Sequence, residues 1–237
     1  MLVLNKEEFI NCKKSDTICV YGCGNSINDL KEHDFNILNK FDSVGFNWFC
    51  KSLIPTTFYL IREQANIPER VAIGETVEDL VSGLISCSKT CLIVHSIKLK
   101  HVFHYDKNLH LFKHHGIILN EVRKKSVREF CNFDLFNDGI VHGKCTLVNV
   151  LHICYYLGYK RVLFVGVDLY DSRYFWTKSI RHNMLKKKIS IKNVHPTTRD
   201  TVNAVQDFLK YYPDVKLYTY NKKSTLSKYI GVFNEQI

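Results

Sequence analysis

Three short segments carry residue types that could do chemistry, and the first is the glycine-rich run GCGNS at residues 22–26. It follows a strand-like run and precedes a helix-like one, so its backbone N–H groups could bind an anion such as a phosphate. The full GxGxxG pattern is absent because Ile27 stands at the third glycine position. Asn47, instead of an acidic residue, follows the second predicted strand. The run therefore disfavours nicotinamide dinucleotide binding and leaves open an anion site or a plain strand–helix turn.

The second segment ends the apolar run RVLFVGV at residues 161–167, which is typical of a strand buried in a parallel sheet. Asp168 and Tyr170 follow it. In open α/β sheets, ligands bind outside the carboxyl ends of the strands. Asp168 is therefore either a site residue or a residue that shapes the loop.

The third segment is His195-Pro196, at the end of a basic stretch. No acidic residue occurs between Ser172 and Arg199, whereas eight lysines and arginines do. The stretch suits a phosphate-rich ligand, an anionic membrane surface or nucleic acid, or it is a solvated loop. A histidine there could be a positioned base or a phosphate ligand.

A metal site is not expected. The histidines at 101, 104, 110, 114 and 115 have spacings that could ligate a metal on a helix, but no carboxylate cluster accompanies them. The sequence also has no D-x-D motif for a Mg²⁺-held nucleotide diphosphate. We expect neither a metal nor a cofactor.

Composition narrows the class of protein. The chain has 237 residues, 46% of them hydrophobic, and a net charge of +10. This predicts one folded domain over residues 1–237 and excludes a disordered chain. No apolar run is long enough to cross a membrane, and the first residues do not resemble a signal peptide. The nine cysteines include no CxxC pair and predict free thiols in a reducing, cytoplasmic setting. The basic stretch leaves peripheral binding to the inner face of the membrane open.

Strand-like and helix-like runs alternate along the chain. The predicted strands span 17–21, 43–46, 56–61, 90–95, 161–167 and 215–220, and the predicted helices span 5–13, 27–33, 75–86, 146–157, 200–212 and 224–230. Ser26 is expected to cap the second helix, and Gly158 to end the fourth. Residues 98–140 show no clear pattern. The order predicts an α/β fold with a mostly parallel sheet flanked by helices, and residues 171–195 form the basic stretch within it.

The order of four features carries a resemblance. The strand–GCGNS–helix start, the segment FDSVGFNWF, the block LGYKRVLFVGVDLY and a later histidine before a helix follow one another. In this order the chain resembles the small bacterial CMP-sialic-acid-dependent sialyltransferases that build lipo-oligosaccharide. More loosely it resembles CMP-Kdo transferases and polysaccharide proteins with one Rossmann-like domain. The resemblance spans roughly residues 17–230, and its specific parts are the LGYK…GVDLY block and the GxGxS turn.

The resemblance implies a Rossmann-like domain with residues 171–195 as a basic lid, and it implies a role for each matching residue. Donor-binding positions fall on Gly22, Gly24, Ser26, Asn47, Thr146 and Asp168. The hydroxyls of Tyr170 and Tyr174 would stabilise the departing phosphate, and His195 would take the proton from the acceptor hydroxyl. The chain departs from the family at Gly143, where an arginine is usual, and at Cys23, where an asparagine is common.

The function implied is an inverting, metal-independent glycosyltransferase that moves a sialic-acid-like sugar from a CMP-sugar donor to a hydroxyl of a glycan or glycolipid acceptor. Alternatives are a CMP-Kdo transferase, a pterin pyrophosphokinase-like enzyme and a basic nucleic-acid-binding protein. The kinase needs acidic Mg²⁺ ligands near Asp168, where Asp171 is the one neighbour. Nucleic-acid binding needs interleaved aromatic and basic residues, but the aromatics gather at 174–176. The sequence leaves the oligomeric state open.

Overall fold

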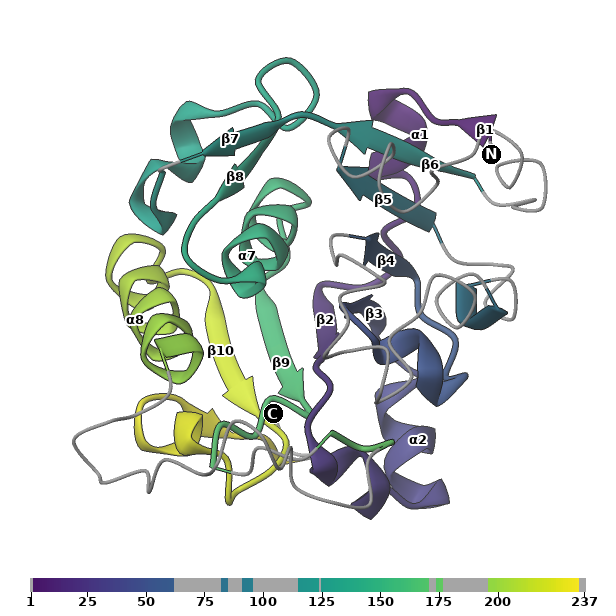
Figure 1. Cartoon of the computed structure of the whole chain (residues 1–237), viewed down its shortest axis with the longest axis vertical. Coiled ribbons are helices and arrows are strands. Elements are labelled where there is room, and N and C mark those ends of the chain that lie inside the picture. The colour runs from purple at the N-terminus through teal and green to yellow at the C-terminus, as the bar shows by residue number, and fades with distance from the viewer. Residues whose placement is uncertain are drawn as a thin grey trace, which may run out of the picture.

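The computed structural model describes residues 2–61, 82–84, 91–95, 115–123, 125–170, 174–176 and 196–234 (Figure 1). Nine strands form one sheet in the order β1-β6-β5-β4-β3-β2-β9-β10-β11. All eight neighbouring pairs in it are parallel. Helices lie on both faces, which confirms the predicted α/β, Rossmann-like class.

The strands of the main sheet are short. They are β1 (Leu2–Val3), β2 (Thr17–Tyr21), β3 (Asp42–Phe46), β4 (Phe58–Ile61), β5 (Cys91–His95), β6 (His115–Leu119), β9 (Arg161–Val165), β10 (Lys216–Thr219) and β11 (Gly231–Val232). A second, two-stranded parallel sheet consists of β7 (Glu121–Arg123) and β8 (Ile140–His142).

Four α-helices are α1 (Lys6–Ile10), α2 (Glu32–Leu38), α7 (Thr146–Tyr156) and α8 (Pro196–Tyr211). The described residues also include four 3₁₀ segments, η1 (Asn25–Asp29), η2 (Phe49–Ser52), η3 (Val127–Asn132) and η4 (Thr225–Lys228). None of the helices in the described ranges is long and apolar enough to span a membrane.

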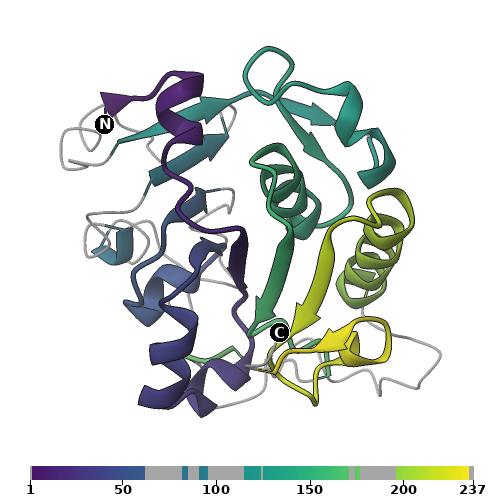
Figure 2. The same cartoon turned by 180° about the vertical axis from the view of Figure 1, so that it is seen from behind.

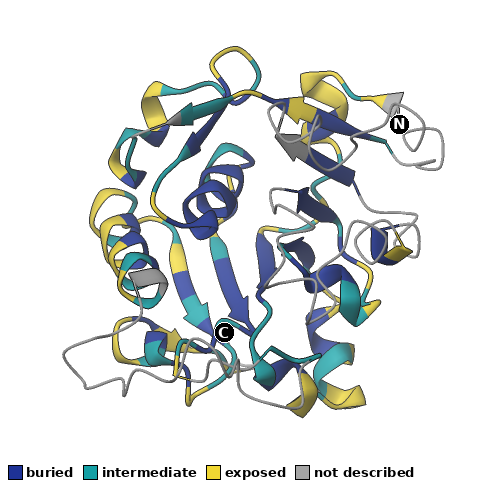
Figure 3. Ribbon diagram, in the orientation of Figure 1, coloured by how far each residue is buried: buried dark blue, intermediate teal, exposed yellow. Residues whose placement is uncertain are grey.

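Alternate side chains of each strand pack against opposite layers, as a pleated strand requires. In β2, Ile18 and Val20 join the cluster under α1, α7 and α8, whereas Cys19 and Tyr21 join the cluster under α2 and η2. Burial on both faces explains why β2 and β9 read as nearly continuous apolar runs (Figure 3). The eight cysteines within the described residues are free thiols, as predicted.

The strand order defines one special boundary. From β2 the chain proceeds through β3, β4 and β5 to β6 in one direction, whereas β9, β10 and β11 extend in the other. The neighbours β2 and β9 therefore flank the topological switch point, where open α/β sheets bind ligands beyond the strand ends. Figures 1 and 2 show α2 near the end to which β9 and β10 point, and α1, β7 and β8 near the opposite end.

The predicted helix over 27–33 is wrong. The chain forms η1 and α2 instead, separated by Leu30 in an extended conformation (φ −68°, ψ 134°). The expected Ser26 cap is also wrong: η1 begins after Gly24 without a side-chain cap, because Ser26 is bonded to a distant residue described below.

Other boundaries shift for local reasons. The strand predicted over 161–167 ends at Val165, since Gly166 has φ +69°. Gly158 ends α7 with φ +68°, as expected. The helix predicted from 200 begins at Pro196, a residue well suited to the first turn.

The remaining differences between predicted and observed elements lie where the sequence pattern is unclear or the elements are short. Residues 98–140 contain β6, β7, η3 and β8. The helix predicted over 224–230 is the short η4, followed by β11. Of the helix predicted over 75–86, residues 82–84 are described and helical, and of the predicted lid, residues 174–176 are described.

Candidate active site at the carboxyl edge of the sheet

The 22–26 turn and the segment after β9 leave the sheet side by side. Tyr21 pairs with Val165 at the end of the parallel ladder. Beyond it, the Gly22 N–H donates to the Val165 carbonyl (2.8 Å), and the Gly24 N–H donates to the Gly166 carbonyl (2.7 Å). The predicted proximity of the turn to Asp168 is therefore confirmed.

Close packing explains the two glycines of the turn. A Cβ on Gly24 would lie 2.4 Å from Oδ2 of Asp168 and 2.6 Å from the Gly166 carbonyl oxygen. A Cβ on Gly22 would lie 2.6 Å from that same carbonyl. Both contacts are far shorter than van der Waals distance, so no larger residue fits without moving the two loops apart.

Asp168 is the centre of a hydrogen-bond network. Asp168 is buried, with 2% of its surface exposed. Its main partner is Ser26, which lies 142 residues earlier in the sequence. The backbone N–H of Ser26 donates to Oδ2 (2.9 Å), and the Ser26 hydroxyl donates to Oδ1 (2.5 Å). The Asn221 side-chain amide also donates to Oδ1 (3.2 Å). The carboxylate thus holds the turn in shape, and donor binding by Asp168 and Ser26 stays a prediction.

Both predicted tyrosines lie beside this network. Tyr170 is 49% exposed, and its hydroxyl accepts a hydrogen bond from Asn221 (3.3 Å). Tyr174 forms an antiparallel bridge with Gly24, and its ring stacks on Trp176 with centroids 4.5 Å apart. Their role towards a phosphate stays a prediction.

Two hydrogen bonds hold the segment 174–176 against the glycine turn and η1. The Phe175 N–H donates to the Cys23 carbonyl (3.2 Å), and the Asn28 side chain donates to the Phe175 carbonyl (2.8 Å). The Phe175 ring packs edge-on against Phe49. The start of the predicted lid is therefore anchored on the glycine turn.

Asn47 follows β3 next to the turn and is strained. Its φ is +56°, and its side-chain Oδ1 is buried without a hydrogen-bond partner in the described structure. The Cys23 thiol donates to the carbonyl of the preceding Phe46 (3.7 Å). Leu169, on the other side of the site, has φ +60°. An unpaired buried acceptor and left-handed non-glycine residues are unfavourable, and such features concentrate where ligands bind.

Thr146 is described at the start of α7, whereas His195 lies outside the described residues. Thr146 directly follows the buried Cys145. Helix α8 starts one residue after His195, which lies outside the described residues. The roles of both residues therefore stay predictions.

The sequence analysis missed the loop after β10. Asn221 bonds to both Asp168 and Tyr170. Ser224 donates through Oγ to the Val167 carbonyl (2.6 Å), and the Thr225 N–H donates to the Asp168 carbonyl (3.0 Å). The rule that singled out Asp168, a polar residue directly after a predicted parallel strand, also applies to Asn221 after 215–220 and could have found it.

Metal ligands are not gathered in the part of the chain that the structure describes. No group of three or more histidines, cysteines or carboxylates lies close enough there to hold an ion. The histidines at 101, 104, 110 and 114 lie outside the described residues.

Comparison with known proteins identifies a shared fold but no relative by sequence. No family model matches the chain. No curated protein matches it significantly. Among solved structures, a variant of the sialyltransferase Cst-II in complex with CMP is similar, with a TM-score of 0.50 and 18% identity over 91% of this chain and 85% of that one.

Two further structures are more distant. The monofunctional α-2,3-sialyltransferase Cst-I from Campylobacter jejuni has a TM-score of 0.47 and 15% identity over 98% of this chain and 82% of its own. An α-2,3-sialyltransferase from Campylobacter jejuni in apo form has a TM-score of 0.46 and 15% identity over 99% and 83%. At 18% identity the similarity to Cst-II is one of fold, so the chain shares the fold of a sialyltransferase solved with CMP bound.

Proposed function

We propose that this protein is a glycosyltransferase that takes a sialic-acid-like sugar from a CMP-activated donor. One observation carries the proposal: the GCGNS turn, Asp168 and two tyrosines meet at the switch point of a parallel sheet. Ligands of such sheets bind at this place. The fold shared with a CMP-bound sialyltransferase supports the same reading.

The leaving group explains the choice of side chains. CMP departs with a monophosphate, which carries less charge than a diphosphate, so hydroxyl donors and nearby cations can neutralise it. Tyr170 and Tyr174 would supply these donors, and the basic residues of 171–195 would add positive charge and exclude water. We therefore propose that turnover needs no metal ion and survives EDTA.

The proton of the acceptor hydroxyl needs a base. His195 is proposed for this role on the resemblance, since a neutral imidazole suits proton abstraction near pH 7. Attack of the hydroxyl on the anomeric carbon, with CMP leaving from the opposite side, inverts that centre. His195→Ala should lower kcat about 10²–10⁴-fold and leave the Kd for CMP nearly unchanged, whereas a phosphate ligand would lose CMP affinity instead.

The acceptor is proposed to be a glycan or glycolipid, and the basic stretch would hold the protein against an anionic membrane that carries it. Binding to vesicles with anionic lipid, but not to neutral vesicles, tests this part alone.

A ligand panel tests the activity. CMP should raise the Tm, whereas ATP with Mg²⁺ or single-stranded oligonucleotides should not. Stabilisation by ATP with Mg²⁺ alone would favour a pyrophosphokinase. CMP-sialic acid and CMP-Kdo, each with a glycan acceptor, then identify the donor, and CMP release is measured.

A matched pair of tyrosine variants links the activity to the site. Tyr170→Phe should lower kcat by about tenfold or more. Tyr211→Phe removes a similarly exposed hydroxyl at the end of α8 and should leave kcat unchanged. Equal activity of the two variants would contradict the role of Tyr170.

A further inference from the structure

Asn221 lies between two groups of the candidate site. Its Nδ2 is 3.2 Å from Oδ1 of Asp168 and 3.3 Å from the hydroxyl oxygen of Tyr170. A side-chain amide nitrogen carries two hydrogens, so it can donate one to each neighbour. Asn221 thereby connects a buried carboxylate to an exposed phenol.

The orientation of this amide is fixed by its surroundings. Its Oδ1 accepts the backbone N–H of Lys223 (2.9 Å), which requires the oxygen to point along the loop and the NH₂ group towards the site. The Asn221 carbonyl accepts from the Ser224 N–H (2.9 Å) and the Thr219 hydroxyl (3.3 Å). Hydrogen bonds to its side chain and to its backbone carbonyl therefore hold Asn221 in place.

This contact decides which role the Tyr170 hydroxyl can play. A phenol oxygen that accepts from Asn221 keeps its own O–H hydrogen for another partner. A carboxylate at that place would instead accept the hydrogen, because a carboxylate has no hydrogen to donate. Between Asp168 and Tyr170, the amide therefore keeps the phenol in the donor role.

We propose that Asn221 is a positioning residue, which keeps the Tyr170 hydroxyl directed as a hydrogen-bond donor to the leaving phosphate of the sugar nucleotide. This inference rests on the proposed function. The exposed Lys222 and Lys223 follow Asn221 directly and add positive charge to the same loop.

The rival role for Asn221 is structural, through Asp168 alone. The two roles differ in how they combine with Tyr170. A residue that acts through the Tyr170 hydroxyl has nothing left to act on once the hydroxyl is removed, whereas a residue that supports Asp168 keeps its effect.

The test is a double-mutant cycle with Asn221→Ala, which removes the donated hydrogens without placing a second carboxylate beside Asp168. In the wild-type background this variant should lower kcat about 10–100-fold and change the Kd for CMP less than about threefold. In the Tyr170→Phe background it should change kcat less than about threefold. Asn203→Ala, which truncates the same side chain at an exposed position of α8, should be neutral in both. Melting curves of each variant establish that it is folded.

A second measurement uses no activity. In a ¹⁵N-labelled protein, the Asn221 side-chain amide signals should move on Tyr170→Phe, since one of the two hydrogens loses its acceptor. Unmoved signals, or equal losses of kcat in both backgrounds, overturn the inference while the transferase proposal stands. A wild-type protein that binds CMP weakly or not at all and transfers no sugar refutes the proposed function first, and the inference with it.

Discussion

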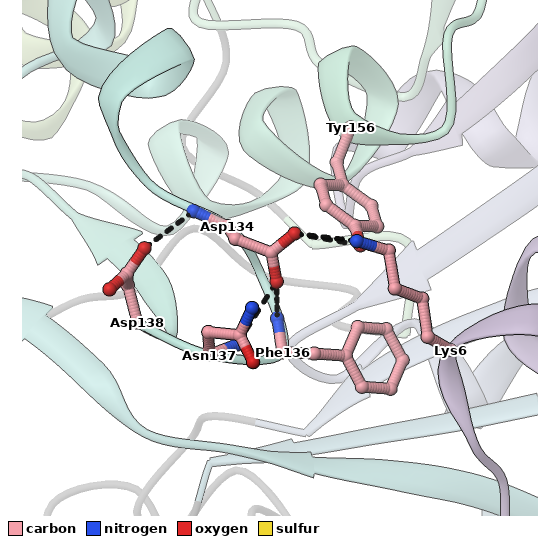
Figure 4. Close-up of polar contacts among 6 residues, drawn as sticks. All are labelled: Lys6, Asp134, Phe136, Asn137, Asp138 and Tyr156. Atoms are coloured by element: carbon pink, nitrogen blue, oxygen red, sulfur yellow. Dashed lines mark hydrogen bonds and ion pairs between the residues drawn. The ribbon is translucent and has the colours of Figure 1, made fainter.

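Two aspartates organise opposite ends of this molecule, and they do so differently. At the end with α1 and the 133–139 turn, Asp134 accepts from Lys6 Nζ (2.7 Å) and from the Tyr156 hydroxyl (3.4 Å) (Figure 4). It also accepts the N–H groups of Phe136 (2.9 Å) and Asn137 (3.0 Å). Every one of these donors comes from the protein, so the network is complete as it stands.

The Asp168 network at the carboxyl edge also takes its donors from the protein, but it differs in burial and in where it ends. It is buried more deeply than Asp134 and ties together three loops, yet it ends on the exposed hydroxyl of Tyr170. Its surroundings include two left-handed residues, Asn47 and Leu169, and a buried acceptor on Asn47 without a partner in the described structure.

The difference shows what to look for in a site without a ligand. A carboxylate whose partners close on themselves contributes to stability, and a lysine beside Asp134 lowers its pKa to about 2. The Asp168 carboxylate is linked through Asn221 to the exposed Tyr170, and left-handed Asn47 and Leu169 lie nearby; unfavourable backbone conformations of this kind concentrate at functional sites. Three substitutions test this contrast, and a fourth concerns a buried histidine of α7.

The largest effect is expected from Asp168→Ala. It leaves the Ser26 N–H, the Ser26 hydroxyl and the Asn221 amide without their acceptor, at a cost of about 3 kcal/mol or more in the free energy of unfolding. The turn should lose its shape, and the affinity for CMP should fall beyond detection. Urea unfolding and a CMP titration measure the two effects; unchanged CMP affinity would remove Asp168 from the site.

Gly24→Ala is the next largest. Its Cβ would overlap Oδ2 of Asp168, so the turn and the Asp168 loop must separate, at about 2–3 kcal/mol. CMP affinity should fall at least tenfold. Gly158→Ala is the matched control: it has φ +68° but open space around it, so it should cost about 1 kcal/mol through the backbone and leave CMP binding intact. Equal CMP affinity in both variants would contradict the tight approach.

The third test concerns a group that neither network uses. His152 is buried in α7, its Nδ1 accepts the Val141 N–H (3.0 Å), and burial lowers its pKa to about 4 from 6.5. The unfolded chain takes up a proton below pH 6.5 but the folded one does so only near pH 4. Stability is therefore complete above pH 6.5 and is lost as the pH falls, by about 2 kcal/mol between pH 7 and pH 5.

Two variants test whether the His152 imidazole causes this loss of stability. His152→Gln should remove most of this pH dependence, whereas His33→Gln, at an exposed position, should keep it. Urea unfolding at pH 5, 6 and 7 measures the three slopes, and identical slopes would show that His152 does not cause the loss.

Asp134→Ala should have the smallest effect, about 1 kcal/mol, because its ion pair with Lys6 is partly exposed. CMP affinity and turnover should not change. A variant as inactive as Asp168→Ala would erase the contrast between the two ends of the molecule.

The sequence by itself determined most of the elements. The β-branched and apolar runs predicted β2, β3, β5, β9 and β10 to within a few residues. In β2 and β9, burial on both faces leaves a nearly continuous apolar signal. Gly158 predicted the end of α7, since a left-handed position strongly favours glycine. Asp168 and the GCGNS turn were found because residues after parallel strands gather at one edge of the sheet.

Tertiary structure alone decided how these parts meet. Ser26 looks like a helix cap locally, but Asp168 offers its hydroxyl a buried, charged acceptor from 142 residues away, and η1 replaces the expected helix. Asn221 looks like an ordinary loop residue until β10 places it beside Asp168 and Tyr170. Both outcomes depend on β2, β9 and β10 being neighbours in the sheet. That order is set by packing and by crossover connections, which no local pattern of residues records.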